Sequence, residues 1–178
     1  MALGGPAMYR HLLAPVDASD LSRDAARQAT QLAAALRARL TFFHALPTPT
    51  VMHLLQETLP GLDENPSLMS PEDIRSCMAA VTEKHLDGLV VIAHGQGVAA
   101  DRDMAEADQP HRGILEAAER LGCDLIVMAS HGRSGVGELL LGSVTHKVLA
   151  QGTIPVLVVR PAPTAEPGSE DNAVAAQR

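Results

Sequence analysis

The residues with the clearest chemical meaning lie in the segment ASHGRSGVGELLLGSV, residues 129–144. The segment contains four glycines, and the last of them, Gly142, is followed by Ser143. Glycine lets a backbone approach a phosphate group without an intervening Cβ, and the N–H groups at the start of a helix attract anions. The segment therefore predicts an anion site that joins a glycine-rich loop to a helix N-terminus. A connecting loop followed by an ordinary helix cap is the alternative.

The elements around this segment predict where it lies in the fold. It follows the apolar run DLIVMAS, which is typical of a buried strand, and amphipathic helical patterns separate it from similar runs. The predicted strands are residues 9–15, 39–46, 88–95, 124–130 and 154–159. Alternating strands and helices predict an α/β fold: a doubly wound, five-stranded parallel sheet with helices on both faces. Ligands of such sheets bind at the carboxyl ends of the strands, where the glycine-rich segment begins.

Local patterns give finer expectations for the helices. Asp17, Ser19 and Asp20 are candidate N-caps of the first helix, and Ser143 is a candidate N-cap of the last. A second helix is expected from Pro71 to about residue 86, and a third is expected to begin at Pro110. The second helix should turn its apolar face inward, and the polar residues 98–107 should form a loop. The inward face consists of Ile74, Met78, Val81 and Leu86.

Length and composition indicate one domain, residues 9–160, in a chain of 178 residues. A flexible N-terminus (1–8), a mobile proline-rich excursion (47–71) and a disordered tail (161–178) are expected around and within it. The net charge of −7 disfavours nucleic acid and anionic membranes as partners. There is no signal-peptide pattern and no apolar run long enough to span a membrane. We therefore expect a cytoplasmic protein in which Cys77 and Cys123 are buried thiols.

Several other chemistries are disfavoured by the motifs. GQGVAA, residues 95–100, matches a dinucleotide fingerprint, but that fingerprint must open a helix, and a loop is expected after it. GRSGV does not match the G-x-S-x-G nucleophile motif, and no Walker lysine is present. No histidine has a neighbour at metal-ligand spacing, so no metal site built from protein ligands is predicted. No positioned base for water is visible, so any hydrolysis is expected to be slow.

Four segments together resemble the universal stress protein family. They are HLLAPVDASDLS, LTFFHAL, DLIVMASHGRSG and LLLGSVTHKVLAQGTIPVLVV, and they are distributed in order along residues 9–160. The nucleotide-binding pattern of this family is glycine, two residues, glycine, nine residues, glycine, then serine or threonine. Gly132, Gly142 and Ser143 match that pattern, whereas Ala129 occupies the position of its first glycine. The resemblance implies the same five-stranded fold and a site for ATP, with magnesium carried on the phosphates as an option.

The resemblance also implies roles for individual residues. Pro15 and Val16 would line the base pocket, and Asp17 would contact the adenosine. Ala45, after His44, would offer backbone groups to the adenine edge, and Met128 would pack near the sugar. His131 would orient the loop or lie near the phosphates. The complete set of predicted binding residues is Pro15, Val16, Asp17, Ala45, Met128, Ala129, His131, Gly132, Arg133, Gly142, Ser143 and Val144.

Two functional readings follow from this resemblance. The first is an ATP-binding stress sensor or regulator, and the second is a family member that has lost nucleotide binding and works as a dimeric interaction module. The choice between them depends most on Ala129, whose methyl group matters only if the backbone there needs a positive φ or if a phosphate approaches Cβ. The resemblance further implies a homodimer that pairs through IPVLVVR, residues 154–160. Such a short apolar strand at a sheet edge must be covered or paired.

Overall fold

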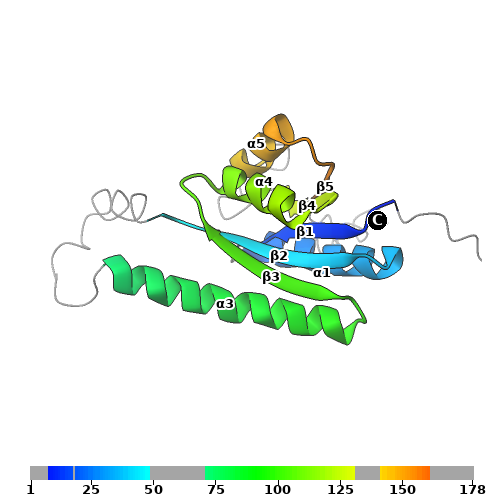
Figure 1. Cartoon of the computed structure of the whole chain (residues 1–178), viewed down its shortest axis with the longest axis horizontal. Coiled ribbons are helices and arrows are strands. Elements are labelled where there is room, and N and C mark those ends of the chain that lie inside the picture. Colours follow the sequence, from blue (N-terminus) through cyan, green and yellow to red (C-terminus); the bar gives the residue numbers. More distant parts are fainter. Residues whose placement is uncertain (1–7, 18, 49–70, 131–140, 161–178) are drawn as a thin grey trace, which may run out of the picture.

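The computed structural model describes residues 8–17, 19–48, 71–130 and 141–160, which form a parallel sheet between two layers of helices (Figure 1). The strand order is β3-β2-β1-β4-β5, and all four neighbouring pairs are parallel. The doubly wound α/β architecture predicted from the sequence is confirmed. In chain order the elements are β1 (His11–Pro15), α1 (Asp20–Leu36), β2 (Arg39–Leu46), α3 (Pro71–Gly95), β3 (Ala100–Glu106), α4 (Pro110–Leu121), β4 (Leu125–Ala129), α5 (Ser143–Gln151) and β5 (Val156–Val159).

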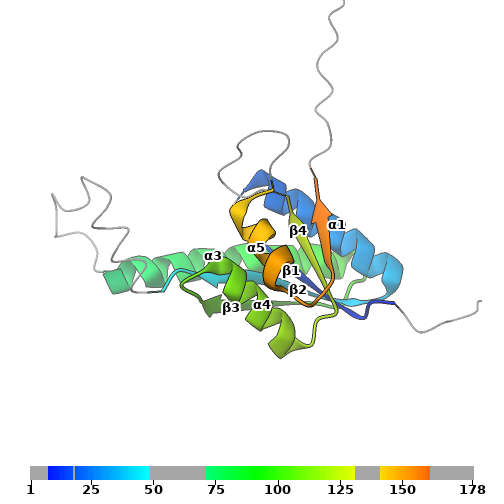
Figure 2. The same ribbon diagram turned by 90° about the horizontal axis from the view of Figure 1, so that it is seen from above.

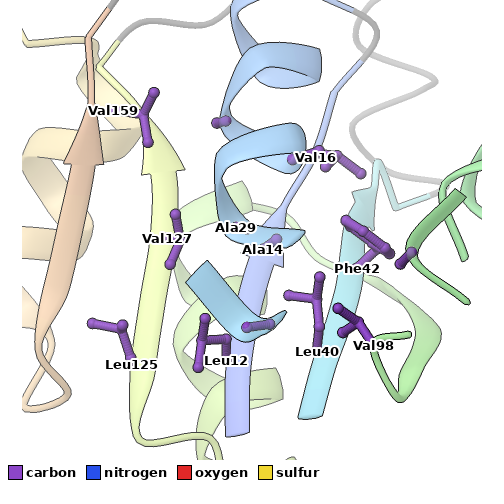
Figure 3. Close-up of a cluster of buried hydrophobic side chains, with 14 of the residues drawn as sticks. Leu12, Ala14, Val16, Ala29, Leu40, Phe42, Val98, Leu125, Val127 and Val159 are labelled. Atoms are coloured by element: carbon purple, nitrogen blue, oxygen red, sulfur yellow. The ribbon is translucent and has the colours of Figure 1, made fainter. Parts of the chain in front are cut away.

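The two faces of the sheet bury separate apolar clusters. Helices α1 and α3 cover one face, while α4 and α5 cover the other, as the two perpendicular views show (Figures 1 and 2). Alternate residues of β1 divide between the clusters: Leu12 and Ala14 face α1, whereas Leu13 faces α4. Figure 3 shows the first cluster, in which side chains of β1, β2 and β4 point to the side that α1 covers. Burial on both faces explains why these strands read as continuous apolar runs.

The third strand was predicted in the wrong place. Residues 88–95, GLVVIAHG, form the last two turns of α3, which extends from Pro71 to Gly95. Residues 98–107 were predicted as a loop, but most of them form β3, which pairs with β2 over seven residue pairs. The fingerprint-like GQGVAA thus links the end of a helix to the start of a strand. A dinucleotide fingerprint must be followed by a helix, and a strand follows this segment instead.

Ion pairs explain how a strand as polar as ADRDMAE is held at the edge of the sheet. Arg102 reaches α3, where it pairs with Glu83 at 2.5 Å and also with Asp87. On the opposite face Asp103 accepts a hydrogen bond from Arg120 of α4 at 2.5 Å. These side chains are partly exposed, so each pair contributes little by itself to stability. Together they satisfy the charges on both faces of β3.

Helix α3 is less deeply buried than the sequence predicted. Leu86 is fully buried as expected, but Val81 is 65% exposed and Met78 is 37% exposed. The helix covers only β2 and β3 at the margin of the sheet, so its outer surface stays in solvent. Cys77 lies on this helix and is exposed, which corrects the prediction that both cysteines are buried.

The other cysteine behaves as predicted. Cys123 is buried, and burial, reinforced by the neighbouring Asp124, raises the pKa of its thiol to about 11. The side chain therefore stays protonated at neutral pH, and a thiolate-based redox role is disfavoured.

Local caps match the sequence signals at two helices. Ser19 is the N-cap of α1, and its hydroxyl accepts a hydrogen bond from the Ser22 N–H. Gly122 follows α4 with a left-handed φ of 66°, the conformation expected for a C-terminal glycine. At α5, however, the N-cap is Gly142, and Ser143 is the first helical residue. The prediction that Ser143 caps this helix is therefore wrong by one position.

The predictions of a flexible N-terminus, a mobile excursion and a disordered tail fall on residues that lie almost entirely outside the described ranges. They stay predictions. Within the described part of the chain, no helix is both long enough and apolar enough to cross a membrane.

Because of two buried histidines, we expect the free energy of unfolding to fall in mild acid. Burial lowers the pKa of His11, with Arg39 adding to the effect, and burial lowers the pKa of His111, with Lys147 adding to it. The unfolded chain therefore binds protons at these sites more readily than the folded chain does. Their contribution to the free energy of unfolding is complete above the unfolded pKa of about 6.5 and falls as the pH drops below it.

Urea unfolding at pH 7.5 and 5.5 measures this loss. We expect a smaller difference between the two pH values in the His11→Gln/His111→Gln variant than in the unsubstituted protein. An equal loss in both proteins would assign the acid sensitivity to other groups.

Candidate functional site

The strand order creates a switch point between β1 and β4. From β1 the chain proceeds to β2 and β3 on one side, whereas β4 and β5 extend the sheet on the other side. The two strands pair only through Leu12 with Leu125 and Leu13 with Ile126, near their amino ends. Beyond these pairs their carboxyl ends carry residues 15–17 and 129–130 to the same edge. In sheets of this type, that edge at the switch point is where ligands bind.

The loop after β1 is held in one conformation by hydrogen bonds around Asp17. One carboxylate oxygen of Asp17 accepts hydrogen bonds from the Ser19 N–H at 2.9 Å and from the Ser19 hydroxyl at 2.5 Å. The Asp17 N–H donates to the Ser22 hydroxyl at 2.8 Å. The Asp17 carboxylate is thus fixed at the carboxyl edge by the first turn of α1. Pro15 and Val16 precede it, and Val16 is buried.

His44 joins this loop to the end of β2. Its Nδ1 lies 2.6 Å from the Val16 carbonyl oxygen, and the Val16 N–H donates to the Phe43 carbonyl at 2.8 Å. A carbonyl can only accept a hydrogen bond, so Nδ1 must carry the proton of this bond. The sequence placed His44 at a strand end but gave it no role. Its bond to Val16 depends on the pairing of β1 with β2, which a local motif does not reveal.

The backbone of Ala45 faces the β1 side at the carboxyl end of β2. Successive residues of a parallel strand direct their N–H and C=O groups to opposite neighbours. In β2, the Phe43 carbonyl accepts from Val16 on the β1 side, and the Leu46 carbonyl accepts from Ala107 on the β3 side. Ala45 therefore faces the β1 side, where the paired ladder already ends opposite Phe43. The structure thus places its peptide groups at the carboxyl edge of the sheet, and their predicted contact with adenine stays a prediction.

The junction between β4 and α5 brings the two ends of the glycine-rich segment together. The Gly142 N–H donates to the Ser130 carbonyl at 2.7 Å, and the Thr145 hydroxyl donates to the Ala129 carbonyl at 2.9 Å. Thr145 is buried and was not among the predicted site residues. It fixes the first turn of α5 against the last residue of β4.

The N-terminus of α5 has no side-chain cap. Its N-cap residue is Gly142, and the first N–H groups of any helix have no partner within the helix. These groups, from Ser143 onward, lie beside the end of β4. Ser143 is exposed and Val144 is half-buried, so both are placed to contribute to an anion site there.

Met128 and Ala129 face the core through their side chains. Met128 is buried in the cluster beneath α4 and α5, and its predicted contact with a sugar stays a prediction. Ala129 is 8% exposed, belongs to the cluster beneath α1, and is not among the described residues with positive φ. The backbone conformation at Ala129 therefore does not require glycine, and its methyl group is largely packed.

Replacing Ala129 with glycine should accordingly leave nucleotide affinity unchanged. We expect an ATP dissociation constant within about twofold of the original and a stability loss of about 0.5–1 kcal/mol, because glycine weakens a strand interior. Isothermal titration and urea unfolding measure the two effects. Clearly tighter ATP binding would show instead that the methyl group restrains the site.

Three predicted binding residues, His131, Gly132 and Arg133, lie outside the described residues, so their roles stay predictions. In the described part of the chain, no group of three or more histidine, cysteine, aspartate or glutamate side chains is arranged to hold a metal ion.

The fold and the switch-point edge define a doubly wound α/β protein with a candidate nucleotide site. The sequence model of the universal stress protein family matches residues 8–160. Universal stress protein YxiE of Bacillus subtilis is 35% identical over 153 residues, covering 86% of this chain and all of that protein. Universal stress protein MJ0531 of Methanocaldococcus jannaschii is 30% identical, covering 88% of this chain and 85% of that protein. The chain belongs to the universal stress protein family.

Solved structures share the fold. The protein MJ0577 superposes with a TM-score of 0.68 at 23% identity, over 87% of this chain and 98% of that chain. A universal stress protein in complex with cAMP superposes with a TM-score of 0.54 at 22% identity, over 86% of this chain and 98% of that chain. A universal stress protein from Archaeoglobus fulgidus in complex with dAMP superposes with a TM-score of 0.56 at 20% identity, over 84% of this chain and 97% of that chain.

Proposed function

We propose that this protein binds ATP at the carboxyl edge of its sheet, between β1 and β4, and acts as a nucleotide-dependent stress sensor or regulator. The observation that carries the proposal is the hydrogen bond from the Gly142 N–H to the Ser130 carbonyl. It brings the helix N-terminus of the glycine pattern to the end of β4 at the switch point. The complexes of related proteins with cAMP and dAMP support an adenine nucleotide as the ligand class.

The proposed pose assigns the nucleotide to two halves of the edge. The β1 half would hold the adenosine, with Asp17 near the sugar or base and the backbone of Ala45 at the adenine edge. The α5 half would hold the phosphates through the helix N-terminus and Ser143, with Gly132 and Arg133 completing the cradle. Helix N–H groups and the helix dipole favour the negative charge of the phosphates. Magnesium, when present, would be carried by those phosphates.

Retention of nucleotide by the purified protein tests the proposal. Mass spectrometry of the acid extract is expected to show ATP or another adenine nucleotide, and isothermal titration of nucleotide-free protein should show saturable ATP binding. Repeating the titration with magnesium and with EDTA shows whether the metal contributes. Absence of both retained nucleotide and binding heat would reject ATP binding and favour the dimeric interaction module.

Homodimerisation through residues 154–160 is a further part of the proposal. Its support is that β5 is an edge strand of four residues and that Leu157 on it is 43% exposed. An uncovered apolar edge strand is a template for pairing with a second strand.

A further inference from the structure

We infer that His44 is a positioning residue that ends the pairing of β1 with β2 and leaves the Ala45 N–H free to read the adenine base. This inference rests on the proposed ATP site and identifies how that site would select its base. It concerns the hydrogen bond between His44 Nδ1 and the Val16 carbonyl, at 2.6 Å.

The regular ladder predicts a different partner for the Val16 carbonyl. In a parallel pair, the C=O of a facing residue accepts from the N–H of one residue on the neighbouring strand, and the next facing residue, two positions on, donates its N–H to the C=O of that same residue. The Phe43 carbonyl accepts from the Val16 N–H at 2.8 Å. The next residue facing β1 is Ala45, so its N–H is the group that would donate to the Val16 carbonyl if the ladder continued.

The imidazole of His44 takes the place of that backbone donor. The ladder ends opposite Phe43, and no described residue accepts a hydrogen bond from the Ala45 N–H on the β1 side. His44 thus satisfies the Val16 carbonyl while Ala45 keeps an unused donor at the carboxyl edge. A strand end without such a side chain would have to pair this donor with Val16 or leave the carbonyl unsatisfied.

The free N–H and the C=O of Ala45 form a donor–acceptor pair that can be compared with the hydrogen-bonding edges of adenine and guanine. Adenine presents an acceptor, N1, next to a donor, the 6-amino group. Guanine presents a donor, N1–H, next to an acceptor, the 6-oxo group. When both bases are held in the same orientation, with N1 at the Ala45 N–H and position 6 at the Ala45 C=O, the Ala45 backbone complements adenine and mismatches guanine. His44 therefore sets base preference without contacting the base.

Substitutions at His44 separate this role from general stability. His44→Ala removes the donor to Val16, whereas His44→Asn keeps an N–H donor at nearly the position of Nδ1. His44→Gln, in which the amide lies further from the backbone, is a second loss variant. His94→Ala is the matched control, because its Nε2 bonds the Ala100 carbonyl at 2.9 Å, where β3 starts at the opposite edge of the sheet.

Amide hydrogen exchange of the nucleotide-free protein measures the Ala45 N–H directly. We expect fast exchange at Ala45 in the unsubstituted protein and slower exchange in His44→Ala, because the freed Val16 carbonyl can now accept from Ala45. Removal of a hydrogen-bonding side chain would thus increase protection at this amide. Unchanged or faster exchange would overturn the inference, whether or not the protein binds ATP.

Titration with ATP and GTP measures the consequence for recognition. We expect His44→Ala to weaken ATP binding about tenfold, the effect of one lost hydrogen bond in a closed site, and to weaken GTP binding less. The ATP preference should return in His44→Asn and remain intact in His94→Ala. Equal weakening of both nucleotides, or unchanged ATP affinity, would overturn the role of His44 alone. Failure of the unsubstituted protein to bind ATP would overturn the proposed function and, with it, base selection.

Discussion

Replacing Ser143 with glutamate is expected to weaken ATP binding by about 100-fold while slightly stabilising the protein. Ser143 is the first residue of α5 and is exposed, so a carboxylate there lies at the positive end of the helix and beside the proposed phosphate site. A helix N-terminus favours a carboxylate by about 0.3–1 kcal/mol. The same carboxylate repels phosphate oxygens, and charges about 4 Å apart interact by several kcal/mol at the effective dielectric of a protein surface.

The opposite signs of the two effects make the experiment discriminating. A variant that binds weakly because it misfolds would also unfold more easily in urea, whereas Ser143→Glu should unfold at slightly higher urea concentration. Ser143→Gln is the matched control, since it has nearly the same shape without the charge, and it should retain most of the affinity. Equal ATP affinity in the glutamate and glutamine variants would place the phosphates away from α5.

The position of the β4–α5 connection at the carboxyl edge could be predicted because it depends on local spacing. The nine residues between Gly132 and Gly142 connect a buried strand to a helix, and the alternation of elements places that connection at the carboxyl edge. The contacts that shape the site could not be predicted in the same way. His44 and Thr145 act on Val16 and Ala129, residues 28 and 16 positions away in the chain. Such pairs depend on strand register and helix docking, which no short motif encodes.

The third strand shows why apolar runs mislead at the margin of a sheet. GLVVIAHG resembles a buried strand, but it continues a helix whose outer surface includes Val91 and Ile92, 69% and 58% exposed. The actual strand, β3, is polar because it lies at the edge and because helices on both faces neutralise its charges. Apolar runs are expected to be buried, but this run is partly exposed on a helix and the true strand is polar, so the sequence assigned strand character to the wrong segment. The predicted number of strands is still five, because the strand wrongly predicted at residues 88–95 is offset by the strand missed within residues 98–107.

Ala129 shows that a sequence motif alone does not reveal the backbone conformation at each of its positions. The sequence marks it as a departure from the glycine pattern of the family, which suggests a weakened site. In the structure its side chain is packed beneath α1 and its φ is not positive, so neither the space nor the conformation at this residue demands glycine. We therefore expect this departure to leave nucleotide binding intact.

A lysine at Leu157 is expected to convert the proposed dimer to monomer. Val156 packs against the core cluster beneath α4 and α5, so a charge at that position would also destabilise the single chain. Leu157 is a cleaner position because it is 43% exposed in the single chain. In a dimer paired through β5 it would lie in the interface, where burying an unpaired charge costs about 2–5 kcal/mol, equivalent to a weakening of at least about 30-fold.

Analytical ultracentrifugation over a range of concentrations measures the expected change. Leu157→Lys should sediment as a monomer at concentrations where the unsubstituted protein is dimeric, with little change in its urea unfolding midpoint, since the substituted side chain is already partly in solvent. Val91→Lys is the matched control, because Val91 is 69% exposed on α3 at the opposite margin of the sheet. A dimeric Leu157→Lys together with a monomeric Val91→Lys would move the interface from β5 to α3.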